Sequence, residues 1–98
     1  MATEAYKEIE NIFPRIIKLM PETFDSHNFI LTLAQKYQKL YIQVLYEFRD
    51  SKRPFHRVHM GIAKRLKKRS DLVAHIDNRF SEDIFGGNNE VAVWRKVK

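Results

Sequence analysis

Histidines and carboxylates at close spacing are the first candidates for chemistry in this sequence. His56 and His59 lie three residues apart, which places both on one face of a helix. Three further candidates follow downstream: Asp71, His75 and Asp77. Imidazole and carboxylate groups are ligands that divalent metals accept, but this spacing matches no specific metal motif. The apolar residues around His59 favour a packed, hydrogen-bonded histidine. We therefore expect no metal site and no cofactor.

The stretch from Arg49 to His56, RDSKRPFH, resembles the Arg-polar-x(n)-His motif of HEPN-type ribonucleases, with Asp50 at the polar position. The resemblance implies a small helical protein in which Arg49 and His56 act on an RNA phosphodiester. The strand-like C-terminus departs from that all-helical pattern. The sequence also contains no Ser-His-Asp order, paired carboxylate signature or glycine-rich phosphate loop. We expect a protein that is not an enzyme, with the small ribonuclease as an alternative.

Positive charge is the strongest chemical signal in the chain. Nine basic residues and one acid lie between residues 49 and 69, a local charge of +8, while the remainder sums to −2 and the whole chain to +6. At about 100° per residue, Arg57, Lys64 and Lys68 fall opposite the apolar residues of the same segment. Because a solvated helix normally mixes both signs, this distribution favours a surface that binds polyanions. The residues expected to contact phosphates are Arg53, Arg57, Lys64, Lys67 and Lys68. The alternative is a solvated helix face without a partner.

Gly61 and Trp94 have two interpretations each. A glycine inside a helix costs about 1 kcal/mol relative to alanine. Because it has no side chain, Gly61 allows either a phosphate backbone or another helix to come close. Trp94 either stacks on bases or closes a small core, and its place after a valine-rich strand favours the core.

Helices are expected over the first two thirds of the chain. In segment 1–20, apolar residues recur at helical spacing until Pro14, which predicts a helix over 3–13 followed by a kink or a second short helix. Pro54 suits the first position of a basic helix over 54–69.

Residues 26–50 are expected to form one long amphipathic helix, capped by Asp25 or Ser26. Its expected buried side chains are Leu33, Tyr37, Leu40, Val44 and Phe48. A helix of this length runs about 37 Å, longer than a small core covers. A homodimer is therefore expected, and an adaptor protein that docks through this helix is an alternative function.

Segment 70–98 has the character of strands. Residues 70–77 fit either a strand or a short helix, residues 81–89 resemble a helical turn stopped by Gly86, and VAVWRKV alternates as a strand does. The fold class expected is α+β and mainly helical, with three or four helices followed by a C-terminal strand or β-hairpin.

Composition bounds the remaining choices. The chain has 98 residues, no cysteine, no repeat and no linker, which predicts one domain over 1–98 in a reducing, cytoplasmic compartment. It has no apolar run long enough to span a membrane and no signal-like start. No small-molecule substrate is indicated.

Helices followed by a strand-bearing segment, with a basic penultimate helix, resemble winged helix-turn-helix DNA-binding domains. The resemblance covers about residues 26–97 and is architectural. It implies that the helix over 54–69 enters the major groove and that the loop over 86–90 is the tip of a wing on the neighbouring backbone. The expected function is therefore a small basic nucleic-acid-binding protein, a winged-helix-like DNA-binding or regulatory domain whose partner is duplex DNA.

Overall fold

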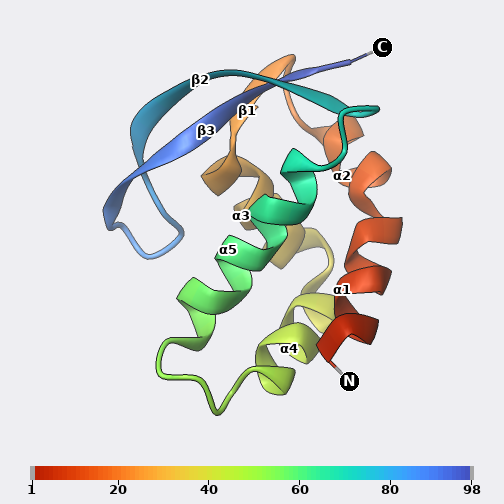
Figure 1. Ribbon diagram of the computed structural model, residues 1–98, viewed down its shortest axis with the longest axis vertical. Coiled ribbons are helices and arrows are strands. Elements are labelled where there is room, and N and C mark those ends of the chain that lie inside the picture. The colour runs from red at the N-terminus through yellow and green to blue at the C-terminus, as the bar shows by residue number, and fades with distance from the viewer. Residues whose placement is uncertain (1, 98) are drawn as a thin grey trace.

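The computed structural model describes residues 2–97, with side chains from Glu4 onward. In this part of the chain five helices lie to one side of a three-stranded antiparallel sheet (Figure 1). The elements are α1 (Ala2–Asn11), α2 (Phe13–Leu19), β1 (Thr23–Asp25), α3 (Ser26–Lys36), α4 (Gln38–Glu47), α5 (Pro54–Lys67), β2 (Val73–Glu82) and β3 (Asn88–Lys96). The α+β class expected from the sequence is confirmed, with more helices than the three or four expected.

The break predicted near Pro14 is confirmed. Helix α1 ends at Asn11, Ile12 has non-helical backbone angles, and Pro14 lies in the first turn of α2. The first turn of a helix tolerates proline because its N–H groups have no partner within the helix. The two helices can therefore turn against each other and bury Ile9, Phe13 and Ile16 completely.

The single helix predicted over 26–50 is wrong, because the chain leaves helical geometry at Tyr37 (φ −128°, ψ 56°) and forms α3 and α4 instead. Helix α3 packs against α2 and the strands, whereas α4 packs against α1 and α5. A straight helix would carry its second half away from α1, so tertiary packing overrides the continuous apolar period. The backbone N–H of Tyr37 still donates to the Leu33 carbonyl at 2.9 Å, and the Gln38 side chain donates to the Gln35 carbonyl at 3.1 Å.

Burial along these two helices follows the break. Leu33 and Val44 are fully buried as expected, but Tyr37, Leu40 and Phe48 are only partly buried at the edge of the core. The cap predicted at the start of the segment is confirmed at Asp25. Its carboxylate accepts the Asn28 N–H at 2.8 Å, while the Asn28 side chain accepts the Asp25 N–H at 3.1 Å.

Helix α5 begins at Pro54, as predicted. Its buried stripe consists of Val58, Ile62 and Leu66, three side chains with no exposed surface. Phe55, one of the apolar residues of this segment, lies off the stripe and is 45% exposed, because it is on the flank of α5 that faces the hairpin.

The sheet has the order β1-β3-β2, so the last strand lies in the middle. Strand β1 was not expected, and it pairs antiparallel with β3 from Thr23↔Arg95 to Asp25↔Val93. The open choice at 70–77 resolves to a strand from Val73 onward. Strand β2 continues to Glu82, which corrects the helical turn expected over 81–89.

The hairpin turn lies earlier than the predicted 86–90. It covers residues 83–87, closed by the Asp83 N–H donating to the Gly87 carbonyl at 2.7 Å, and Gly86 has a φ of +86° that favours glycine. The residues from Asn88 to Glu90 pair with β2 as part of β3.

One cluster of buried side chains includes residues from every helix and strand described. Trp94 belongs to it, with 3% of its surface exposed and its indole N–H donating to the Ser26 hydroxyl at 3.0 Å. The core interpretation of Trp94 is confirmed. None of the helices described here combines the length and the apolar character that crossing a membrane requires.

Candidate nucleic-acid interface

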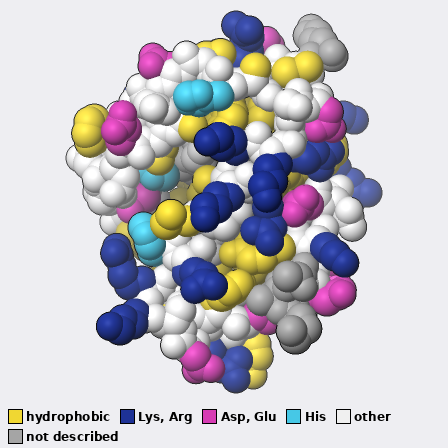
Figure 2. Space-filling model, viewed as in Figure 1, with side chains coloured by type: hydrophobic (Ala, Val, Ile, Leu, Met, Phe, Trp, Pro, Cys, Tyr) yellow, Lys and Arg dark blue, Asp and Glu magenta, His cyan; other side chains and the backbone are white. Residues whose placement is uncertain are grey.

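The five predicted phosphate-contacting residues are all exposed, either on α5 or at its two ends. Arg53 is the residue before the helix, Arg57, Lys64 and Lys67 lie within it, and Lys68 follows its last turn. Figure 2 shows Lys and Arg side chains gathered over α5 in the centre of this face. Since Val58, Ile62 and Leu66 hold the opposite side of α5 in the core, these cations are presented outward on a fixed element.

A groove of about 650 Å³ lies beside α5, between the helix, the 48–53 segment and α1. Three predicted residues line it: Arg53, Arg57 and Lys64. Lys67 and Lys68 do not line it and lie farther along toward the C-terminal end of α5. The structure adds Lys52, His56 and Arg65 to the lining, none of which was among the predicted phosphate-contacting residues.

Aromatic rings form the apolar part of the groove. Tyr6 from α1 and Phe48 from the end of α4 contact each other with ring centroids 5.5 Å apart, and both line the groove. Glycine at position 61 allows Tyr6 to come this close, because a Cβ there would lie only 2.7 Å from Tyr6 Cζ. Of the two roles considered for Gly61, the structure supports close packing of another helix.

Two arginines lie over this aromatic pair. The Arg65 guanidinium carbon is 3.7 Å from the centroid of the Tyr6 ring, and the Arg57 guanidinium carbon is 5.1 Å from the centroid of Phe48. Burial raises the pKa of the Tyr6 hydroxyl, while Arg65 and Arg57 act in the opposite direction. Arg65 also forms an ion pair with Glu10, with Nε 3.1 Å from Oε2, and donates from a terminal nitrogen to the Gly61 carbonyl at 3.2 Å.

The histidines and carboxylates considered for a metal do not come together. No cluster of three or more metal-ligating side chains exists within residues 4–97. Asp71 instead forms a two-point ion pair with Arg69, and the His75 ring contacts Trp94 edge-on.

His59 is the packed, hydrogen-bonded histidine that the sequence favoured. Its Nε2 is 2.6 Å from the Tyr41 hydroxyl, and its ring stacks between Tyr41 and Phe85. Burial lowers the pKa of His59 to about 4, although Asp83 acts to raise it.

Arg49 and His56, the two residues proposed for the ribonuclease-like stretch, lie in different surroundings. The Arg49 guanidinium lies over the Tyr46 ring, 4.1 Å from its centroid, and donates to the Tyr46 carbonyl at 3.0 Å. His56 lines the groove, and Arg49 does not. The three-stranded sheet also departs from the all-helical pattern of that family.

The tip of the hairpin folds back onto α5. Phe85 packs edge-to-face on Phe55 with ring centroids 4.7 Å apart. The Asp83 carboxylate accepts the N–H groups of Gly87 and Phe85 at 3.0 and 2.9 Å, and these bonds hold its pKa below the ordinary value. From Glu82 to Glu90 the hairpin carries three acids and no Lys or Arg.

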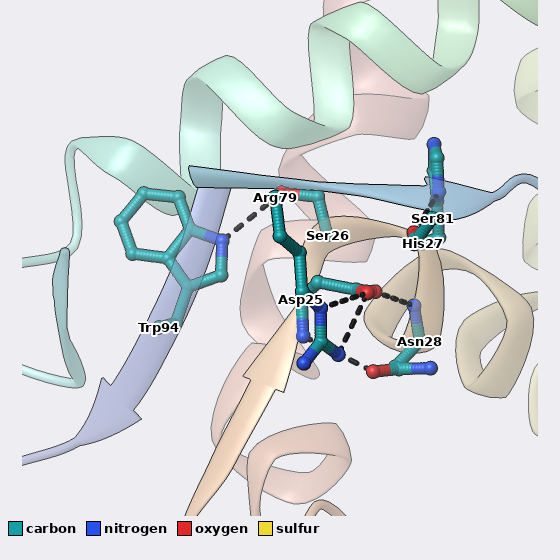
Figure 3. Close-up of polar contacts among 7 residues, drawn as sticks. All are labelled: Asp25, Ser26, His27, Asn28, Arg79, Ser81 and Trp94. Carbon is teal, nitrogen blue, oxygen red and sulfur yellow. Dashed lines mark hydrogen bonds and ion pairs between the residues drawn. The ribbon is translucent and has the colours of Figure 1, made fainter. Parts of the chain in front are cut away.

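A polar cluster joins the start of α3 to β2 (Figure 3). Asp25 is 1% exposed, and its Oδ2 accepts from two guanidinium nitrogens of Arg79 at 3.1 and 2.9 Å. Next to it, His27 Nδ1 is 2.6 Å from the Ser81 hydroxyl oxygen. Burial acts to raise the pKa of Asp25, but hydrogen bonds from Asn28, Arg79 and Ser81 lower it below the ordinary value. These contacts tie the far half of β2 to the start of α3.

Comparison of the chain with protein-family models, with curated proteins and with solved structures finds no match.

Proposed function

We propose that this protein binds nucleic acid, with duplex DNA as the partner, through the exposed face of α5. One observation carries the proposal: five cations lie outward along a helix whose other side is anchored by fully buried Val58, Ile62 and Leu66. A row of fixed cations neutralises backbone phosphates and releases their counterions, which supplies affinity without base contacts. Base recognition would come from side chains on the same face, such as His56 and Met60.

The winged-helix resemblance supports the same placement of α5. Helices α4 and α5 precede the β2–β3 hairpin, and strand β1 adds the third strand to the sheet. In winged-helix domains the basic helix enters the major groove and the hairpin touches the neighbouring backbone. The hairpin of this chain has an acidic tip held against α5 by Phe85, so we assign the phosphate contacts to α5 and the 48–53 segment instead. The cytoplasm as compartment and a homodimer as assembly remain predictions.

Fluorescence anisotropy with a labelled random-sequence duplex across a salt series tests this function. If about four side chains each neutralise one phosphate, log K should fall with log salt at a slope of about −3.6. Replacing Lys64 and Lys68 together by alanine should flatten the slope by nearly two units. The thermal midpoint should stay unchanged, because exposed charges contribute little to folding.

A matched control is the double variant Lys36→Ala and Lys39→Ala, which removes the same charge from exposed positions on α3 and α4. It should keep most of the slope. Equal slopes for the wild type and the Lys64/Lys68 variant, or no binding to DNA or RNA at low salt, would contradict the function.

A further inference from the structure

Arg57 and Arg65 lie on the same side of α5 with Tyr6 between them. They are eight residues apart, and Gly61 halfway between them leaves the space that the Tyr6 ring fills. Both arginines line the groove, Arg65 over the Tyr6 ring and Arg57 over the neighbouring Phe48 ring. The groove thus holds two guanidinium groups and one phenol hydroxyl, arranged around the rings of Tyr6 and Phe48.

Stacking on a ring orients an arginine without using its N–H groups. A guanidinium that lies over an aromatic face keeps its edge free to donate to an oxyanion, and the stacking reduces the rotamer freedom that binding would remove. Phosphate is the anion whose geometry the guanidinium fork matches in two-point hydrogen bonds. The Tyr6 hydroxyl adds a neutral donor to the same groove.

Glu10 already pairs with one charge of this arrangement. Its Oε2 lies 3.1 Å from Arg65 Nε in an ion pair, while a terminal nitrogen of Arg65 donates to the Gly61 carbonyl. The Glu10 and Arg65 side chains are about one third exposed, at 35% and 28%. An exposed ion pair of this kind is weak, so an incoming phosphate can replace the carboxylate. Among the described residues Arg57 has no ion pair, which leaves its charge available from the start.

We propose that Arg57, Arg65 and Tyr6 form a clamp for successive phosphates of a nucleic-acid backbone, with Glu10 as a built-in competitor that the backbone displaces from Arg65. The clamp rests on the proposed function and specifies which groups hold the backbone beside α5. The extent of the basic row favours a backbone over a small phosphate compound. From Arg53 to Lys68 the row is about 22 Å long at 1.5 Å per residue, which corresponds to about six phosphates on one DNA strand.

The test measures duplex DNA binding by Glu10→Gln, Arg65→Ala and their double variant across a salt series. Glu10→Gln should raise affinity about two- to fivefold, because it removes a competing charge that is partly screened by solvent. Arg65→Ala should flatten the salt slope by about 0.9. In the double variant the gain from Glu10→Gln should disappear, since the residue with which Glu10 competes for phosphate is gone.

Matched controls separate the clamp from general charge and stability effects. Glu8→Gln, on the exposed face of α1, and Arg15→Ala, on α2, make the same charge changes away from the groove. Arg65→Lys keeps the charge and the salt slope but should lose affinity severalfold, because lysine lacks the planar fork. Tyr6→Phe keeps the ring and should weaken binding only if the hydroxyl donates to phosphate. A thermal melt of each variant checks that it is folded.

The outcomes distinguish the clamp from the function. If the wild type does not bind DNA, both are overturned. If the Lys64/Lys68 variant loses salt dependence while Glu10→Gln matches Glu8→Gln and Arg65→Ala matches Arg15→Ala, the clamp alone is overturned. Displacement of DNA from the wild type, but not from Arg65→Ala, by pyrophosphate at constant ionic strength would overturn the backbone as ligand in favour of a small phosphate compound.

Discussion

The ring of Tyr6 occupies the space where any residue larger than glycine at position 61 would place its Cβ. Helix propensity alone would favour alanine there by about 1 kcal/mol. The 2.7 Å approach to Tyr6 Cζ outweighs this preference, because the Tyr6 ring is itself buried and is held by its contacts with Phe48 and Arg65. A single residue of unfavourable propensity in α5 therefore marks where the Tyr6 side chain of α1 reaches this helix.

Gly61→Ala should lower the free energy of unfolding by about 1–3 kcal/mol, the range for forcing extra volume into a packed site. Denaturant titration measures the change. The loss should shrink when Tyr6→Leu is present as well, because leucine leaves room at the ring position. Stabilisation by the alanine would show that Tyr6 moves aside without cost.

Leu33 and Leu40 both belong to the apolar repeat of residues 26–50, but they differ in burial. Leu33 is fully buried and Leu40 is partly buried beside the break at Tyr37. Leu33→Ala should cost about 2–5 kcal/mol through the cavity it leaves. Leu40→Ala should cost clearly less, since solvent already reaches the side chain. Equal losses in denaturant midpoint analysis would indicate that α3 and α4 form one buried face after all.

At the scale of elements, His59 joins three parts of the molecule. It is hydrogen-bonded to Tyr41 of α4, lies on α5 and stacks on Phe85 at the tip of the hairpin. Burial holds the ring neutral by lowering its pKa to about 4. Unfolded, the same side chain titrates near its ordinary value of about 6.5.

Stability should therefore depend on pH between these two values. Above pH 6.5 the contribution of neutral His59 is fully present, and it is lost as pH falls toward 4, because the unfolded chain binds the proton first. The loss should reach about 1–3 kcal/mol after solvent screening. His59→Gln, which keeps a partner for Tyr41, should flatten this part of a stability-versus-pH curve. An unchanged curve would assign the acid sensitivity to other groups.

The elements that local rules predict well are those with their own start and stop signals. Pro54 begins α5, Pro14 lies in the first turn of α2 just after the break from α1, and Asp25 caps α3 as its spacing to Asn28 allows. Strand β1 has three residues, too few for any alternation, and it exists because β3 pairs with it. The break at Tyr37 has no glycine or proline signal, and the packing of α4 on α1 and α5 accounts for it.

The candidate site was likewise predictable only where its signal is local in the sequence. Its charge was visible in the sequence because basic residues cluster locally between 49 and 69. Tyr6 and Phe48 were not visible as site residues, because their contact joins segments about forty residues apart. Gly61 was the one local signal of that contact, since a glycine inside a helix is unfavourable without a neighbour that needs the space.

At the scale of the whole molecule, the homodimer predicted from a long helix needs another surface. Helix α4 offers one: Ile42 and Tyr46 lie one turn apart, and each is 61% exposed. If the dimer forms there, sedimentation equilibrium should show twice the chain mass of 11.7 kDa, and Ile42→Glu should return it to the monomer. A single species near 11.7 kDa at high micromolar concentration would rule the dimer out.

The central position of β3 also determines when the protein can fold during synthesis. The strand lies between β1 and β2. The N–H of its last residue, Lys96, donates to the Glu22 carbonyl, and the N–H of the next residue, Val97, donates to the Leu72 carbonyl. A nascent chain that stops before residue 88 has both outer strands but nothing to join them, and lacks Trp94 from its core. The sheet therefore closes last, and its β1–β3 pairing joins segments distant in sequence, a kind of contact that slows folding. Ribosome-bound chains should resist protease over the helices before they do over the strands.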